Sequence, residues 1–431
     1  MADGLDLADD PKIDPSIAQA LITPKAYATG EVFDSYEWLR ANKPLGIADL
    51  EGVDPFWVVT KYDDVIEVSK DNKLFPYGDR CSTLIDQASD AKQREVTGRP
   101  SMIQTLVQLD EPEHMQLRRL TQKWFMPPNL KQRRVEISAI ADKTVSKFVA
   151  TGGQCDFAAD IALHYPLEVV MQILGVPEQD FPMMLTLTQE IFAPLDEDSQ
   201  RAMNSLSPTA YAEAIMAVIA DFATYFDNLS QARRVEPKDD LATLIATAEI
   251  DGAPITAEQA LGYYVIVATA GHDTTSSSTS GGMWALATQD GLLQKLKEQP
   301  DLIPGFVEES VRWTTPVRNF MRSPSEDVTI RGRTIKKGDW LMLCYASANR
   351  DEDVFEAPNE FRVDRETRQL AFGHGAHMCL GLHLARMEMQ LLWEKLIPRL
   401  KSVSLDGAPA GIESTFVTGL KRLPIQFELE A

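Results

Sequence analysis

A glycine-rich decapeptide around one cysteine constrains this chain more than any other feature. Residues 372–381 read Phe-Gly-His-Gly-Ala-His-Met-Cys-Leu-Gly, and an apolar stripe predicts a helix over residues 380–400, directly after Cys379. The positive end of a helix dipole and its unpaired N–H groups stabilise a thiolate. Glycines allow positive φ angles and a close approach of the backbone to a bulky partner. Since no second cysteine is nearby, the decapeptide suits a thiolate ligand of one large cofactor.

Three interpretations of this decapeptide are open from its residues alone. Haem iron is bound by a thiolate in some proteins, and the anionic sulfur pushes electron density toward O–O cleavage. A zinc site is the second interpretation, although zinc usually recruits two or more cysteines at tight spacing, and the other candidate ligands here are His374, His377 and His383. The third is an inert buried cysteine, which is the default for a lone one.

The apolar spacing predicts a mainly α-helical protein with small β-sheets. Residues 85–101 are polar and are interpreted as a long surface loop. The helical patterns lie at residues 60–75, 113–126, 134–150, 159–175, 208–232, 256–285 and 302–313, and the strand-like segments at 56–60, 327–331 and 339–345.

A run of hydroxyl residues and glycines at 274–282 has the composition of a flexible linker. It is flanked on both sides by apolar segments with helical spacing, however, and a linker between two exposed apolar segments would be unusual. We therefore interpret residues 256–285 as one long buried helix that hydroxyl side chains loosen locally.

The overall charge excludes some partners. The chain has 64 acidic and 42 basic residues, a formal net charge of −22, whereas nucleic acids and anionic membrane surfaces attract clustered Lys and Arg. We find no apolar segment of the roughly 20 residues that span a bilayer and no signal peptide at the acidic start. Four cysteines in 431 residues do not form a disulfide framework. The composition indicates a cytoplasmic protein that binds neither nucleic acid nor membrane.

Four motifs together resemble the cytochrome P-450 superfamily, the haem-thiolate monooxygenases, and they follow one another in the order that those enzymes show. The motifs are Asp110-Glu111-Pro112-Glu113-His114-Met115-Gln116-Leu117-Arg118, Ala270-Gly271-His272-Asp273-Thr274-Thr275, Glu309-Ser310-Val311-Arg312, and the decapeptide at 372–381. The chain is most similar to the soluble bacterial type, and within it to the branch that oxidises monoterpene alcohols such as terpineol.

This resemblance implies a single cytochrome P-450 domain over residues 1–431, with haem b between the long central helix and the helix after the cysteine loop. It implies Cys379 as the axial thiolate ligand of the iron. Further cofactor contacts are expected from Phe372 and Gly373 in the loop, from Ala270 and Gly271 in the central helix, and from donors to the haem propionates at His114, Arg118, Arg322 and His377.

Asp273 and Thr274 occupy the oxygen-activation stretch of the family. Splitting dioxygen requires protons, which a carboxylate at Asp273 can relay and which the Thr274 hydroxyl can direct by hydrogen bonding. A Thr274 hydroxyl bonded back to the Ala270 carbonyl would also widen the helix. From the residues alone, Asp-Thr could instead be the N-cap of a new helix. His272 has no assigned function, and a satisfied core histidine is its default interpretation.

Glu309 and Arg312 fit the family's E-x-x-R helix. Residues three apart share a helix face, and a buried pair of this kind needs further hydrogen bonds to be tolerated. In the family the partner precedes the cysteine loop, so Arg365 is the expected third member. The implied role is structural support of the loop. A surface ion pair is the alternative that the spacing alone leaves open.

The implied reaction is hydroxylation of a small hydrophobic substrate, a monoterpene or an aromatic hydrocarbon, with dioxygen. A haem-thiolate peroxygenase and a non-catalytic haem-based ligand sensor are the alternatives, and the intact Asp-Thr pair argues against the first. By analogy with the family, the substrate walls come from the 85–107 and 176–215 regions and from Val267, Ala270, Val317, Asn319, Phe320, Phe416 and Val417.

Electrons must come from another protein, because the chain has no nucleotide-binding fingerprint and no cysteine set for an iron–sulfur cluster. The resemblance implies an iron–sulfur ferredoxin and a ferredoxin reductase, with this chain acting as a monomer. Residues 114–135 contain six Lys or Arg and no acid, which favours a basic docking face for an acidic ferredoxin. Its proposed members are Arg119, Lys123, Arg133, Arg134 and Arg386.

Overall fold

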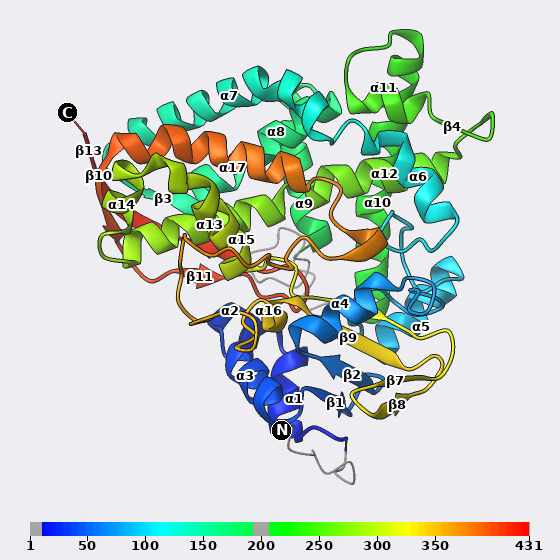
Figure 1. The fold of residues 1–431 in the computed structure, drawn as a ribbon. Coiled ribbons are helices and arrows are strands. Elements are labelled where there is room, and N and C mark those ends of the chain that lie inside the picture. Colours follow the sequence, from blue (N-terminus) through cyan, green and yellow to red (C-terminus); the bar gives the residue numbers. More distant parts are fainter. Residues whose placement is uncertain (1–10, 193–206, 431) are drawn as a thin grey trace.

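The computed structural model describes residues 11–192 and 207–430 and is shown as a ribbon in Figure 1. The N-terminal elements are α1 (Pro15–Ile22), α2 (Pro24–Thr29), α3 (Val32–Asn42), β1 (Leu45–Ala48), β2 (Phe56–Val59), α4 (Tyr62–Lys70) and α5 (Gln87–Thr97). The central elements are α6 (Glu113–Gln122), α7 (Pro127–Ala150), β3 (Gln154–Asp156), a π-helical segment (Phe157–Ala162), α8 (His164–Leu174), α9 (Phe181–Phe192), α10 (Pro208–Val235), α11 (Leu241–Ala246), β4 (Glu249–Ile250), β5 (Ala253–Pro254), α12 (Ala257–Ala270) and α13 (Asp273–Thr288).

The C-terminal elements complete the helical layer and add most of the strands. They are α14 (Leu292–Glu298), α15 (Ile303–Thr314), β6 (Asn319–Arg322), β7 (Val328–Ile330), β8 (Arg333–Ile335), β9 (Trp340–Cys344), α16 (Tyr345–Ala348), α17 (Leu382–Leu396), β10 (Leu400–Leu405), β11 (Ala410–Gly411), β12 (Leu420–Arg422) and β13 (Pro424–Leu429). This mainly α-helical architecture with small sheets is the fold class that the apolar spacing predicts.

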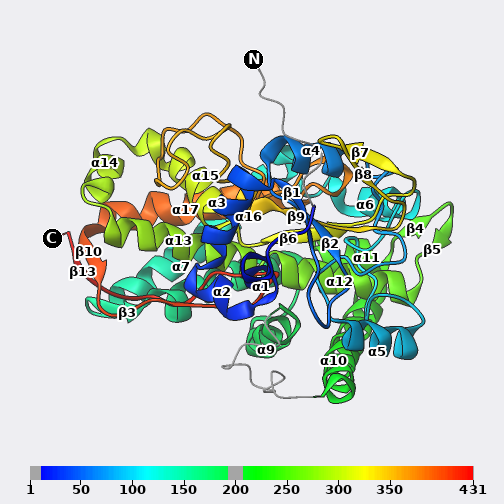
Figure 2. The same ribbon diagram turned by 90° about the horizontal axis from the view of Figure 1, so that it is seen from below.

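The largest sheet has the strand order β1-β2-β9-β6 and lies beside α1, α2 and α3, below the helices in Figure 1. Its central strands β2 and β9 are parallel, and every residue of both is buried. Near-continuous apolar runs such as Phe-Trp-Val-Val and Trp-Leu-Met-Leu-Cys are typical of strands covered on both faces. Figure 2 shows the β7–β8 hairpin and the three-stranded sheet β10-β13-β3 at opposite ends of the molecule.

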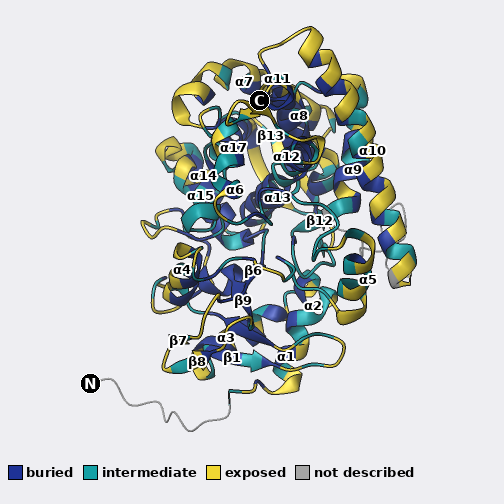
Figure 3. Cartoon of the chain, turned by 90° about the vertical axis from the view of Figure 1, so that its right-hand side faces the viewer, coloured by how far each residue is buried: buried dark blue, intermediate teal, exposed yellow. Residues whose placement is uncertain are grey.

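The core of the helical layer is α8, α12 and α13, while α7 and α10 expose their outer faces (Figure 3). The hydroxyl-rich run lies inside α13 and is buried from Thr275 to Gly282, so the helical interpretation is confirmed and the linker is excluded. Its small side chains let neighbouring helices approach. A Cβ at Gly281 would collide with Thr314 Oγ1 of α15, and one at Gly282 would press on Trp393 of α17.

Three details differ from the prediction. The polar stretch 85–101 is not a loop but contains α5, because Asp86 accepts a hydrogen bond from the Ser89 N–H at 2.9 Å and Gly98 ends the helix at φ 73°. The central helix is interrupted between α12 and α13, where His272 has ψ −72°. The helix after the cysteine begins at Leu382, two residues later than predicted.

One helical stretch, Phe157–Leu174, is long and apolar enough by length and composition to cross a membrane, with a mean hydropathy of 1.2. The sequence analysis found no such segment. The stretch joins the π-helical segment to α8, and 67% of it is buried inside the protein, where Phe157, Ile161 and Val169 have no exposed surface. Its apolar character is therefore accounted for by the core.

Candidate functional site

The cysteine loop is closed by its own backbone. The Cys379 N–H donates to the Phe372 carbonyl at 2.8 Å, and the Gly373 N–H donates to the Leu370 carbonyl at 2.8 Å. Gly375 has φ +74°, and a Cβ there would collide with the Ser69 carbonyl at the end of α4. This turn therefore requires glycine for both conformation and space.

The Cys379 thiol lies at the end of this loop, just before α17. Burial raises the pKa of the Cys379 thiol, while the Gly381 N–H and the nearby charges of Arg118 and Arg386 lower it. All four cysteines lie within the described residues and are free, and of these Cys379 alone lines the internal cavity described below. Because burial disfavours a free thiolate, a bound cation is what would hold this sulfur deprotonated.

An internal cavity of about 250 Å³ extends between the cysteine loop and the helix pair α12–α13. Cys379, Phe372 and Gly373 line one side, and Ala270, Gly271 and Thr274 line another. The remaining wall is mainly apolar and includes Leu106, Val170, Ile173, Ile266, Val267 and Val317. Two motifs far apart in the sequence, the cysteine loop and the central-helix stretch with Thr274, thus line the same cavity.

The four predicted propionate donors, His114, Arg118, Arg322 and His377, all line the same cavity, together with His374. The His114 and His377 rings lie 4.0 Å apart between centroids, and Arg118 Nη2 donates to the Met378 carbonyl at 2.6 Å. Burial, strengthened by neighbouring positive charges, lowers the pKa of His114 to about 4 and that of His377 to about 2. The buried His114 Nδ1 has no hydrogen-bond partner among the described residues.

This basic cluster has little negative charge around it. Asp110 acts electrostatically on His114, but its two oxygens accept hydrogen bonds from the Tyr77 and Gly78 N–H groups at 3.0 Å each. Arg322 lies 3.7 Å above the Tyr77 ring. Within the described part of the chain, neither Arg118 nor Arg322 forms an ion pair with a carboxylate. A buried cluster of this kind suits an anionic ligand group, because unpaired buried charge is costly.

Thr274 faces the cavity, and its hydroxyl donates to the Ala270 carbonyl at 2.8 Å, the bond expected from the sequence. This bond lies at the interruption between α12 and α13. Gly271 is needed here because a Cβ would press on Val170 of α8. Asp273 does not line the cavity, although the sequence analysis placed it beside Thr274 in function. Its side chain lies near His272 instead, and burial raises its pKa.

Glu309 and Arg312 form a buried ion pair in α15. Arg312 donates from Nε and Nη2 to the two carboxylate oxygens, each at 2.7 Å, and from Nη1 to the Asn349 carbonyl at 2.7 Å. Arg365 Nε donates to Glu309 Oε1 at 3.0 Å, and the Arg362 N–H donates to the same oxygen at 2.7 Å. The three predicted members are therefore in contact, and the carboxylate is fully engaged. The pair is not the surface ion pair that the spacing alone left open.

Only some of the residues predicted for the substrate wall line the cavity. Val267, Ala270, Val317 and Phe320 line the cavity. Asn319 does not, because alternate residues of a strand point to opposite faces and its amide donates to the Thr415 carbonyl instead.

Phe416 and Val417, also predicted for the substrate wall, do not line the cavity. Phe416 packs against Phe320 from behind, with centroids 5.2 Å apart, and Val417 is buried opposite Val317 in an isolated β-bridge. Leu106 and Val107 come from the 85–107 region. No described residue of the 176–215 region lines the cavity, and residues 193–206 of it lie outside the described part of the chain.

Several lining residues were not predicted from the sequence, and two of them, Tyr77 and Glu388, carry polar groups. Tyr77 contacts both Arg322 and His377, and no local motif marks it. Glu388 is a buried acid on α17, whose pKa burial raises well above the ordinary value, and the Thr275 hydroxyl is its hydrogen-bond partner. The signal available for Glu388 was an acid inside an otherwise apolar helix face nine residues after Cys379.

The predicted basic face is weaker than its residue count indicates. Arg133 pairs with Asp239 and Arg134 with Glu394, and both nitrogens of Arg386 pair with Glu308. Arg119 and Lys123 are exposed, and no acid of the described residues pairs with them. Only the latter two thus present unneutralised charge.

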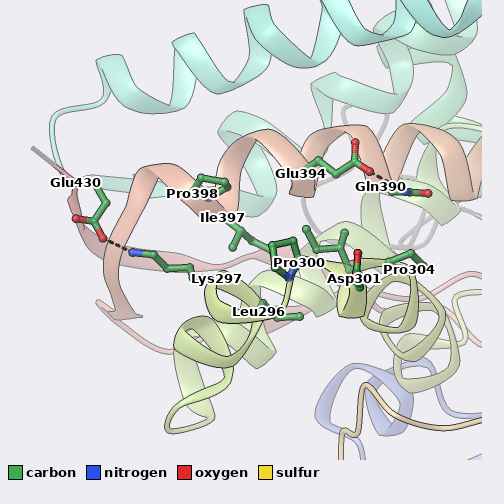
Figure 4. A pocket seen from close by; sticks show the side chains of 11 residues that line it. Leu296, Lys297, Pro300, Asp301, Pro304, Gln390, Glu394, Ile397, Pro398 and Glu430 are labelled. Atoms are coloured by element: carbon green, nitrogen blue, oxygen red, sulfur yellow. Dashed lines mark hydrogen bonds and ion pairs between the residues drawn. The ribbon is translucent and has the colours of Figure 1, made fainter.

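A second hollow, of about 580 Å³, is a surface cleft between α14, α15 and the C-terminal half of α17 (Figure 4). Its charged lining includes Asp301 and Glu394 as well as the pair Lys297–Glu430. None of the predicted site residues lies in it, so it is not the site that the motifs define.

Comparison with known proteins assigns the family. The sequence model of the family Cytochrome P450 matches residues 54–429. A protein of a Pseudomonas species, named cytochrome P450-terp, is 44% identical over 415 residues, which cover 95% of this chain and 97% of that protein. A steroid C26-monooxygenase of Mycolicibacterium smegmatis is 30% identical over 410 residues, covering 94% of this chain and 95% of that protein.

The fold gives the same assignment. The crystal structure of CYP108D1 from Novosphingobium aromaticivorans matches with a TM-score of 0.90 and 41% identity, covering 97% of this chain and 100% of that one. The chain belongs to the cytochrome P450 family. It is accordingly a monooxygenase that binds haem through a cysteine thiolate.

The residues present fit this cofactor. A buried thiol opens onto the cavity on one side, and along it lie the four predicted propionate donors, which form no ion pair with a carboxylate of the described residues. Haem brings a cation for the thiolate and two propionate carboxylates for the basic groups. The orphaned Nδ1 of His114 is the kind of buried polar atom that such a carboxylate would satisfy.

Proposed function

We propose that this protein hydroxylates a small hydrophobic substrate, a monoterpene or an aromatic hydrocarbon, with electrons supplied by a ferredoxin and its reductase. The single observation that carries the proposal is the cavity in which Cys379 faces Thr274 across apolar walls. In the balanced reaction one oxygen atom of dioxygen enters a C–H bond and the other becomes water, which consumes two electrons and two protons. The whole chain acts as one catalytic domain, as a monomer in the cytoplasm.

The roles of the residues follow from their positions. Haem, when bound, supplies the iron at which dioxygen is activated. Cys379 ligates it, and the closed backbone turn from Phe372 to Cys379 holds the sulfur in place. His114, Arg118, Arg322 and His377 bind its carboxylates, and Glu309, Arg312 and Arg365 hold the segment before the loop.

Proton delivery is assigned to the helix interruption. Thr274 holds a hydroxyl at the cavity surface, where its own bond to the Ala270 carbonyl fixes the direction of its oxygen. Asp273 carries a buried carboxyl, and burial raises its pKa, which favours the form that carries a proton. Because the two residues are adjacent in the chain, a proton held by the Asp273 carboxyl outside the cavity can pass to the Thr274 hydroxyl at the cavity surface.

The substrate class is proposed from the wall and from the relatives. Valine, leucine and isoleucine side chains above the helix interruption exclude charged molecules and water. The 44% identical relative is named P450-terp, which supports a terpene over other small apolar compounds. Screening terpene alcohols and aromatic hydrocarbons for binding-induced changes in the haem spectrum would test the class; changes only with polar or charged compounds would contradict it.

Replacing Thr274 with Ala should uncouple electron consumption from product formation. The substitution removes the hydroxyl that directs protons in the cavity, so reduction of dioxygen should end in the release of hydrogen peroxide. The amount of product formed per electron pair should therefore fall by roughly tenfold. The measurement compares reductant consumed, product formed and peroxide released.

Thr269→Ala is the matched control for this variant. Thr269 also bonds back along the helix, to the Val265 carbonyl at 2.7 Å, but it lies outside the cavity. Thr269→Ala removes the same kind of hydrogen bond, but electron consumption should stay coupled to product formation. Equal coupling in Thr274→Ala and the unsubstituted protein would remove Thr274 from the mechanism.

Reversing the charge of Arg119 and Lys123 should slow reduction by ferredoxin. These exposed cations carry the unneutralised charge of the docking face, and steering by such charges changes association rates by on the order of tenfold at low ionic strength. The effect should shrink as salt is added. The control is Lys337→Glu in the turn between β8 and β9, whose charge change equals that of either single reversal, Arg119→Glu or Lys123→Glu. Equal rates for both variants would place the docking face elsewhere.

A further inference from the structure

His272 stands at the helix interruption without a function in the proposed reaction. Its side chain has no exposed surface, so it is not a surface histidine. It lies between three elements: α8, α9 and the start of α13. A fully buried, polar, titratable side chain next to the proposed proton carrier requires an account of each of its two nitrogens.

The Nε2 atom anchors the ring. It lies 2.8 Å from the Leu163 carbonyl, which precedes α8. A carbonyl only accepts hydrogen bonds, so Nε2 carries a hydrogen. The ring is therefore held in one orientation from the α8 side, and the protonation of the other nitrogen decides its remaining contacts.

The Nδ1 atom faces two partners. It lies 3.2 Å from Thr188 Oγ1 of α9 and 3.5 Å from Asp273 Oδ1. The Thr188 hydroxyl is also 3.0 Å from the Leu185 carbonyl, to which it can donate. With the Thr188 hydrogen directed to Leu185, Nδ1 is left to face Asp273 Oδ1, and a proton carried by either atom would join the two.

The Asp273 carboxyl is left with one free oxygen. Its Oδ2 is buried and has no hydrogen-bond partner among the described residues. His272 is also the one ionisable group of the described chain that acts electrostatically on this carboxyl. The His272 ring thus contacts Oδ1 of Asp273 from the side of α8 and α9. The other oxygen, Oδ2, is left to exchange protons at the helix interruption.

We propose that His272 is a positioning residue: anchored through Nε2 on the Leu163 carbonyl, it orients the Asp273 carboxyl through Nδ1 so that Oδ2 alone exchanges protons. The inference rests on the proposed function, in which Asp273 carries the proton. Orienting the Asp273 carboxyl is a different role from packing in the core, and experiments can distinguish the two.

Two substitutions distinguish the two nitrogens. In His272→Asn the side-chain amide occupies the place of Nδ1 and keeps a donor toward Asp273, but it loses the anchor. In His272→Gln the amide reaches the place of Nε2 and keeps the bond to the Leu163 carbonyl, but it loses the contact with Asp273. A merely structural histidine would be replaced better by Gln, whereas a positioning histidine is replaced better by Asn.

The test uses full-length, haem-loaded protein and two readouts. Infrared difference spectra against Asp273→Asn identify the carboxyl band of Asp273 in the resting protein, without turnover. We expect this band to shift in His272→Gln and to stay closer to its original position in His272→Asn. Turnover of terpineol should fall by about tenfold in His272→Gln, as for loss of one hydrogen bond to a charged group, and by less in His272→Asn.

The Asp273→Asn background separates failure of the inference from failure of the proposed function. If Asp273 carries the proton, His272→Gln should cause no additional loss in that background. An unshifted band in His272→Gln, a Gln variant that turns over as well as the Asn variant, or an additive loss in the double variant would overturn the positioning role. Full turnover by Asp273→Asn alone would instead overturn the proton role of Asp273 and, with it, the basis of the inference.

Discussion

Replacing Asp273 with Asn should slow substrate oxidation by on the order of 10²-fold, the lower range for a positioned proton-transfer group. Asparagine keeps the size of the side chain but cannot hold or release a proton. Because the carboxyl is buried and its Oδ2 has no hydrogen-bond partner within residues 11–192 and 207–430, no acid of these residues is in place to replace it directly. The measurement is the steady-state rate of product formation at saturating ferredoxin.

Asp64→Asn is the matched control. Asp64 is also a buried acid whose pKa burial raises, but it lies on α4, pairs with Arg331 and does not line the cavity. Its variant should keep the rate of the unsubstituted protein. A normal rate in Asp273→Asn would show that protons reach the cavity by another route, for which the buried Glu388 would become the first candidate.

Replacing Glu309 with Gln should destabilise the folded protein by roughly 3–5 kcal/mol, the cost of removing one partner of a buried ion pair. The carboxylate has 2% exposure and accepts from Arg312, Arg365 and the Arg362 N–H. A neutral amide can satisfy only part of this set and leaves two buried guanidinium groups without their counter-charge. Denaturant unfolding, monitored together with loss of haem, measures the effect.

Glu352→Gln provides the comparison. Glu352 also accepts two hydrogen bonds from a buried arginine, Arg40, at 2.9 and 2.6 Å, but its side chain is 45% exposed. Water can replace what the substitution removes, so the cost should be about 0–1 kcal/mol. Equal losses in the two variants would mean that the E-x-x-R carboxylate contributes no more than a surface ion pair.

Local motifs were the parts of the site that the sequence could predict. The cysteine loop depends on glycines at fixed spacing and on bonds within ten residues, such as that from the Cys379 N–H to the Phe372 carbonyl. The bond from Thr274 to the Ala270 carbonyl spans one helical turn. Interactions of this range follow from residue types and spacing, so their geometry agrees with the expectation.

Contacts between segments that are distant in the sequence could not be predicted from it. Asn319 and Phe320 are adjacent in sequence, but only the strand's register decides which of them faces the cavity. Arg386 is basic in the sequence, yet it is neutralised by Glu308, which lies 78 residues away. The turn of Asp273 toward His272 likewise depends on the packing of α8 and α9 around the helix interruption.

The absorption spectrum of the reduced protein with carbon monoxide tests the central claim, that Cys379 ligates the haem iron, most directly. The unsubstituted protein should show the strongly red-shifted Soret band of a thiolate ligand, and Cys379→Ser should lose that band. Cys155→Ser, which removes a thiol far from the cavity on β3, should keep it. An unshifted band in the unsubstituted protein, or a shifted band that persists in Cys379→Ser, would contradict the assignment.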